Sequence, residues 1–245
     1  MKYLVILSYD GSSYNGYQKQ KHDKNTIQQK VEDALSTIFK TKIEIYASGR
    51  TDKGVHAIAQ PFHFESDIKI PFSNLKKALN EILPLDIKIK KVSKAKDDFH
   101  ARYSKIKKIY VYKIKNSDII DPFDSRYVTY VKEKIDYDLL LEASKLFIGE
   151  HDFRNFTTNK ASEVDSFVKK IFDVKVKRST NRYEITFEGS GFLRYQIRMM
   201  VGAIIVVATG KKDISFIKNM LSPNVDSRCS YKADPQGLYL KEVVY

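Results

Sequence analysis

The sequence is poor in cysteine and in long apolar runs. Its single cysteine, Cys229, excludes a disulfide framework, so a reducing compartment is expected. The apolar run at residues 3–7 is too short for the core of a signal peptide, and the most apolar stretch, residues 203–208, falls well below the about 20 residues that span a bilayer. We therefore expect a soluble, cytoplasmic protein with no membrane partner.

Several cofactor and hydrolase motifs are also missing. The five histidines show no close paired spacing, and the lone cysteine offers no second thiolate, so we expect no metal. There is no P-loop and no G-x-S-x-G elbow, and Gly189-Ser190-Gly191 lacks the third glycine of a dinucleotide site. We expect no cofactor.

Positive charge is plentiful. Lys and Arg total 43 against 30 Asp and Glu, which leaves a formal charge of +13 and a pI near 9.5. Hydrophobic residues make up 42% of the chain, which is a globular composition. Most of the cations are lysines, so two interpretations stay open: a solubilising surface, or a surface that binds nucleic acid by releasing counterions.

Hydrophobic periodicity predicts the order β-α-β-β-α-β twice. We infer an α+β fold of two ferredoxin-like halves with antiparallel sheets side by side, residues 1–104 and residues 105–245. The first half is predicted to hold strands at residues 3–9, 43–48, 58–65 and 87–92. Its helices are predicted at residues 26–39, with Thr26 as the cap, and at residues 71–83. The second half is predicted to hold strands at residues 107–115, 169–177, 183–188 and 237–244, with helices at residues 137–147, 193–209 and 215–221.

The densest polar cluster is the segment Ser48-Gly49-Arg50-Thr51-Asp52-Lys53-Gly54-Val55-His56-Ala57, between two predicted strands. A carboxylate held near a guanidinium stays ionised and can act as a nucleophile or base, so Asp52 is the candidate catalytic residue and Arg50 its neighbour. A purely structural role stays open, in which Asp52 caps local amides and His56 is a packed histidine.

Two further positions stand out. Arg198 lies on a largely apolar predicted helix and needs an anionic partner if it is buried, although it can also lie on the solvated side. Tyr110 and Tyr112 face the same side of a predicted strand among lysines, a pattern that suits base stacking but is also common in ordinary sheet packing.

Together these segments resemble the TruA family of tRNA pseudouridine synthases over nearly the whole chain. The strongest match is Gly49-Arg50-Thr51-Asp52-x-Gly54-Val55-His56-Ala57, the family's signature loop. The other matches, in order, are Tyr9-Asp10-Gly11 with Gly16-Tyr17-Gln18, Phe99-His100-Ala101-Arg102-Tyr103, Tyr110-x-Tyr112, Gly149-x-His151-Asp152-Phe153, Phe192-Leu193 with Arg198-x-Met200-Val201-Gly202, and Pro235-x-Gly237-Leu238. The chain departs from the family at Tyr17, where many members have Trp, at Gln196, where Met is common, and at Asp234, where apolar residues are usual.

The resemblance implies a role for each matched site residue. Asp52 corresponds to the catalytic aspartate, Arg50 to the residue near the flipped nucleotide, and Arg198 to the partner of Asp52. Tyr110 corresponds to the tyrosine that contacts the target base, and Leu238 to an apolar contact with that base. The family fold is two ferredoxin-like halves with a cleft between them, for which we expect positive charge. Its members are homodimers that isomerise uridines 38 to 40 of the tRNA anticodon stem-loop, without metal or organic cofactor.

Two functions are therefore weighed. The favoured one is a tRNA pseudouridine synthase, an isomerase. The alternative is a non-catalytic RNA-binding or chaperone protein that uses the same basic surface.

Overall fold

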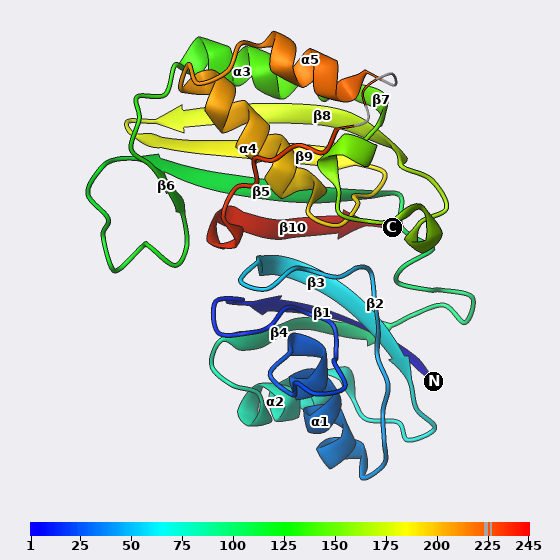
Figure 1. Cartoon of the computed structure of the whole chain (residues 1–245). Coiled ribbons are helices and arrows are strands. Elements are labelled where there is room, and N and C mark those ends of the chain that lie inside the picture. The colour runs from blue at the N-terminus through cyan, green and yellow to red at the C-terminus, as the bar shows by residue number, and fades with distance from the viewer. Residues whose placement is uncertain (223–224, 226) are drawn as a thin grey trace. The chain divides into compact units, whose positions relative to one another are not determined.

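The computed structural model describes residues 1–222, 225 and 227–245 (Figure 1). This part of the chain forms a mixed α+β structure with five α-helices and ten strands, whose pairings are mostly antiparallel. It divides into two compact units: Met1–Ile106 with Tyr239–Tyr245, and Lys107–Leu238. The expected domains, residues 1–104 and 105–245, stay a prediction.

The first unit is built on a sheet whose middle strand is β1. Strand β1 pairs antiparallel with β3 and with β4, while the short β2 pairs antiparallel with β3 and β10 runs parallel to it. Helices α1 and α2 lie together beside this sheet (Figure 1). The bounds are β1 (Lys2–Tyr9), α1 (Ile27–Phe39), β2 (Tyr46–Ala47), β3 (His56–Glu65), α2 (Phe72–Ile82), β4 (Ile87–Lys94) and β10 (Leu238–Val244).

The core of the first unit follows from the alternation along β1. Tyr3, Val5 and Leu7 point to one face and are fully buried, while the residues between them are half-buried. Tyr3 stacks on Phe64 of β3 with ring centroids 4.8 Å apart, and Phe39 from the end of α1 meets both rings edge-on. Such aromatic pairs add to the stabilisation that burial provides.

The second unit is an antiparallel sheet in the order β5-β9-β8-β7, with β6 parallel to β5. Helix α4 is buried on all sides except at Ile205, which explains why its sequence is largely apolar. It packs against α3 (Figure 1). The bounds are β5 (Lys107–Asn116), β6 (Thr129–Val131), α3 (Tyr137–Lys145), β7 (Gly149–Asp152), β8 (Val168–Ser179), β9 (Arg182–Gly189), α4 (Gln196–Ala208) and α5 (Ser215–Leu221).

Most predicted elements are present, and the exceptions have physical causes. Thr26 is the predicted cap of α1, and its hydroxyl accepts the amide of Gln29. The strand predicted at residues 43–48 shrinks to β2. The alternating isoleucines, Ile43 and Ile45, are buried as a strand pattern requires, but their amides donate to Ser36 and Glu32 of α1 instead of to a neighbouring strand.

The predicted helix at residues 193–209 begins three residues late. Tyr195 adopts the left-handed conformation, with φ of 61°, so regular helix begins only at Gln196. The last predicted strand is present as β10, but it pairs with β3 of the first unit through Tyr239 opposite His56.

Candidate active site

The signature loop lies between β2 and β3 and ends in a tight turn. The amide of Val55 donates to the carbonyl oxygen of Asp52 at 3.1 Å, and Gly54 takes a positive φ of 78° that side chains disfavour. Thr51 is buried, Asp52 is half-buried and Arg50 is exposed. The turn therefore presents a half-buried carboxylate two residues after an exposed guanidinium.

A second loop, residues 10–18, packs directly against this turn. A Cβ atom on Gly11 would lie 2.0 Å from the carbonyl oxygen of Val55, a distance that real Cβ atoms do not reach. Gly16 has a φ of 90°, and a Cβ atom on Gly16 would lie 3.0 Å from the carbonyl oxygen of Thr51. This glycine-bearing segment is therefore a structured loop that needs both glycines to approach the signature loop.

Hydrogen bonds join the two loops as well. The amide of Tyr17 donates to the carbonyl oxygen of Thr51 at 3.1 Å. At the end of β1, the hydroxyl of Tyr9 bonds to the hydroxyl of Thr51 at 2.8 Å in a buried position. Thr51 is thus held through its backbone and its side chain, which fixes the residue directly before Asp52. Gly11 and Gly16 are the only mark of this contact in the sequence. A pair of glycines indicates a close approach of the backbone but does not identify the segment that is approached.

His56 is a packed histidine, as one of the open interpretations held. Its ring is 2% exposed and stacks on Tyr239 with centroids 4.6 Å apart. The amide of Gly11 donates to Nδ1 of His56 at 3.1 Å, which requires that this nitrogen carry no proton. Oδ1 of Asp10 also lies 3.1 Å from Nδ1, so a proton there would replace the Gly11 hydrogen bond with an ion pair.

In the second unit, Arg198 is buried on α4, so the alternative that it lies on the solvated side is wrong. Its Nε donates to the carbonyl oxygen of Ala233 at 2.8 Å, and the amide of Ala233 donates back to the carbonyl oxygen of Arg198. The guanidinium lies over the ring of Tyr195, 5.3 Å from the ring centroid. These contacts hold the guanidinium in one orientation.

Tyr110 and Tyr112 do face the same side of β5, opposite Phe187 and Ile185 of β9. Their surroundings differ. Tyr110 meets Phe192 edge-on at 5.2 Å, whereas the hydroxyl of Tyr112 bonds to Thr129 and to the carbonyl oxygen of Asp234. Burial raises the pKa of Tyr112 well above its usual value. Tyr112 therefore serves the fold.

Leu238 is buried at the start of β10, directly after a short turn at Pro235–Gly237. A Cβ on Gly237 would lie 2.7 Å from the hydroxyl of Thr129 and 2.8 Å from the carbonyl oxygen of Lys113, so only glycine fits there. That close approach positions Leu238.

The predicted site residues fall in both units. Asp52 and Arg50 belong to the first unit, whereas Tyr110, Arg198 and Leu238 belong to the second. The pairing of Arg198 with Asp52 stays a prediction.

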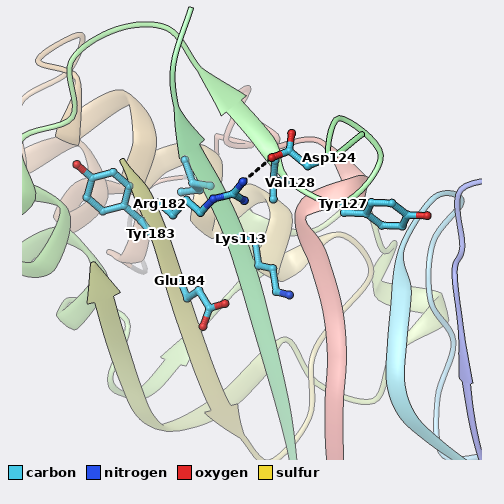
Figure 2. Close-up of a pocket in the computed structure, with 8 residues that line it drawn as sticks. Lys113, Asp124, Tyr127, Val128, Arg182, Tyr183 and Glu184 are labelled. Atoms are coloured by element: carbon cyan, nitrogen blue, oxygen red, sulfur yellow. Dashed lines mark hydrogen bonds and ion pairs between the residues drawn. The ribbon is translucent and has the colours of Figure 1, made fainter. Parts of the chain in front are cut away.

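A cavity of about 200 Å³ opens in the second unit, and none of the predicted site residues lines it (Figure 2). Asp124 at its edge pairs with Arg182 at 2.5 Å and Lys115 at 3.0 Å, and accepts a hydrogen bond from Tyr130. Burial acts to raise the pKa of Asp124, but these three donors outweigh it and lower the pKa to about 2. The volume is below the ~300 Å³ of ordinary ligand pockets, so this network is structural. The cavity is lined by Lys113, Ile114, Asp124, Tyr127, Val128, Arg182, Tyr183 and Glu184.

Across residues 1–222, 225 and 227–245, no three His, Cys, Asp or Glu side chains gather as metal ligands would. Within the same residues, no helix is both long and apolar enough to cross a bilayer.

Comparison with known proteins places the chain. A family model described as tRNA pseudouridine synthase matches residues 5–104 and 143–245. The tRNA pseudouridine synthase A of Staphylococcus aureus (strain MRSA252) is 36% identical over 243 residues, which are 99% of this chain and 91% of that protein. The protein of the same name from Staphylococcus saprophyticus is 37% identical, with 99% and 90% covered. Among solved structures, a Cbf5-Nop10-Gar1 complex covers 98% of this chain and 48% of the matched chain at 11% identity and a TM-score of 0.42, which is too low to carry an argument.

Proposed function

The chain belongs to the tRNA pseudouridine synthase family, and we propose that Asp52 is the carboxylate with which it isomerises uridine in tRNA. It is an isomerase. The observation that carries the proposal for Asp52 is the interlocking of the signature loop with residues 10–18, because Gly11 and Thr51 hold the turn that presents this side chain. Preorganisation of this kind is what a catalytic group needs.

The reaction breaks the bond between C1′ and N1, turns the base, and joins C1′ to C5. The proton that leaves C5 is balanced by the proton that N1 gains. A carboxylate beside C1′ can attack it, stabilise a positive sugar, or remove a proton at C2′. All three routes would use the side-chain carboxylate of Asp52 in its anionic form.

The target base must first leave its stack, which costs a few kcal/mol. Arg50 is exposed and two residues from Asp52, so its guanidinium is available to stack in the vacated space. We assign it that role.

The second unit supplies the other proposed contacts. Arg198 has a fixed guanidinium and would pair with Asp52, keeping that carboxylate ionised. Tyr110 would contact the base and handle its C5 proton, while Leu238 would pack against the base. Family resemblance supports these three roles, and the firm packing of each residue is compatible with them.

The finer features follow the same resemblance. In the first unit, β1 pairs with β3 and β4 and β3 pairs with β2, which is the pairing of a ferredoxin-like half. We propose two such halves with a positively charged cleft, a homodimer, and action on uridines 38 to 40 of the anticodon stem-loop. A cytoplasmic location fits the single, buried cysteine.

The test is Asp52→Asn, assayed by tritium release from 5-labelled uridine in unmodified tRNA. We expect no detectable release and a tRNA affinity within a few-fold of wild type. Asp67→Asn, at an exposed aspartate of the same unit, is the matched control and should be fully active. Release by Asp52→Asn at the wild-type rate would contradict the assignment. Wild-type protein that binds tRNA without release would favour the non-catalytic alternative.

A further inference from the structure

A cluster of rings surrounds His63, near the far end of β3 from the Asp52 loop. His63 is 3% exposed, stacks on Tyr46 of β2 at 5.2 Å and meets His100 at 4.7 Å. His100 in turn packs on Tyr103 at 4.5 Å, and Tyr46 on His100 at 5.9 Å. We call Tyr46, His100, Arg102 and Tyr103 the ring surface. Nothing in the chemistry at Asp52 requires it.

The outer rings of this cluster face solvent. Tyr46 is 50% exposed and Tyr103 is 73% exposed, although both contact other rings. Scattered exposed aromatics are common, but Tyr46 and Tyr103 each pack on a further ring of this cluster, which makes the surface firm. The fold gains little from the exposed faces, which points to a bound partner.

Hydrogen bonds hold the segment that carries these rings. Nδ1 of His63 accepts the amide of Ala101 at 3.2 Å, and Nδ1 of His100 accepts the amide of Arg102 at 3.1 Å. Tyr245 donates its hydroxyl to the carbonyl oxygen of Ala101 at 2.9 Å. The ring surface is therefore preformed and loses little conformational freedom on binding.

Positive charge lies on the same surface. The guanidinium of exposed Arg102 lies over the ring of Tyr103, 5.7 Å from its centroid. In the described part of the chain no carboxylate forms an ion pair with Arg102. A cation beside stacked rings suits a ligand that offers both a phosphate and an aromatic base.

We propose that the ring surface binds an unpaired nucleobase and its phosphate in the RNA substrate, outside the nucleotide that reacts. The proposal rests on the proposed function for its choice of RNA. A second copy of the chain fits less well at this surface, because it offers no phosphate to the guanidinium of Arg102. His63 follows His56 by seven residues along β3, which is about 23 Å at the rise of a strand. The contact therefore serves binding and leaves the chemical step alone.

Tyr103 is the residue to change, because it is the most exposed ring of the surface. Tyr103→Leu keeps apolar volume and removes the ring, whereas Tyr103→Phe keeps the ring. Phe172→Leu is the matched control, since Phe172 is an exposed ring (43%) on β8 of the other unit. Dissociation constants for unmodified tRNA, with kcat and KM from tritium release, are measured for all three and for wild type.

Loss of one stacked base is expected to weaken binding about tenfold or more in Tyr103→Leu. KM should rise in step while kcat stays within twofold, and Tyr103→Phe and Phe172→Leu should match wild type within twofold. Wild-type affinity in Tyr103→Leu, or equal weakening in Tyr103→Phe, would overturn the inference. Wild-type protein that neither binds nor modifies tRNA would instead overturn the proposed function.

Crosslinking separates RNA from protein as the partner. A photoreactive benzoylphenylalanine at position 103 should form an adduct with tRNA on irradiation. An adduct with a second copy of the chain, and none with tRNA, would contradict the inference. Thermal unfolding of each variant should match wild type, because the ring of Tyr103 is mostly outside the core.

Discussion

Gly11 shows how one residue controls the site. The Cβ of Gly11→Ala would meet the carbonyl oxygen of Val55 at 2.0 Å, so the turn that presents Asp52 must shift. We expect a loss of at least about 2 kcal/mol in the free energy of unfolding and a fall in kcat of tenfold or more. Urea unfolding and tritium release measure both.

Gly210→Ala is the control for this prediction. Gly210 has a φ of 71° but open space around its Cβ position, so the substitution costs only about 1 kcal/mol of backbone strain. Its activity should be normal. Normal activity in Gly11→Ala as well would show that the approach of the two loops does not position Asp52.

His63 makes stability depend on pH. Burial, followed by the charges of His100 and Lys2, lowers the pKa of His63 to about 4. The unfolded chain binds a proton at this residue below about pH 6.5, whereas the folded chain does not until about pH 4. The stabilisation is therefore complete above pH 6.5 and is lost as the pH falls toward 4.

We expect this linkage to cost the wild type about 2 kcal/mol between pH 7.5 and pH 4.5. In urea unfolding, the free energy of unfolding of His63→Gln should fall by about 2 kcal/mol less than that of wild type over this pH range. His22→Asn, at an exposed histidine, should keep it. An identical pH dependence in His63→Gln and wild type would show that protonation of His63 is not the cause of the loss.

At the scale of elements, Asp124 ties the segment between β5 and β6 to the sheet. It bonds to Lys115 of β5, to Tyr130 of β6 and to Arg182 of β9. Asp124→Asn removes the charge that these donors share, and we expect a cost of about 1 kcal/mol with faster amide hydrogen exchange in residues 117–128. Asp118→Asn, at an exposed aspartate of the same segment, should change neither quantity.

The sign of the pH effect follows from the lowered pKa of Asp124. Its contribution is present above about pH 4, where the unfolded carboxyl is also ionised, and is lost as the pH falls toward 2. Wild type should therefore approach Asp124→Asn in stability under acid conditions. A difference between them that persists unchanged at pH 2 would contradict the ion-pair explanation.

Elements were predictable where periodicity and end signals agree. The alternation of β1 and the Thr26 cap of α1 are local features, and the structure confirms both. The strand at residues 43–48 was overpredicted because periodicity reports burial but does not report which partner takes the amides. The start of α4 was missed because the left-handed Tyr195 leaves no mark in the pattern.

For the whole molecule, the +13 charge predicts steep salt dependence of tRNA binding. With about five phosphates neutralised, affinity should fall by roughly 100- to 500-fold between 50 and 200 mM KCl. A plot of log Kd against log salt tests this, with Lys212→Gln expected to change the slope by less than one. A plot with no slope would show that the lysines do not contact tRNA phosphates and only keep the protein soluble.

Residue types and their spacing were enough to identify the family and the signature loop, because the motifs that define both are short, contiguous segments of the sequence. Packing between distant segments decided the rest. It set Gly11 against Val55, buried Arg198, paired β10 with β3 and gathered the rings around His63. Most of these contacts join segments more than 30 residues apart, and their approach depends on how all the buried surfaces fit together, which no local pattern encodes.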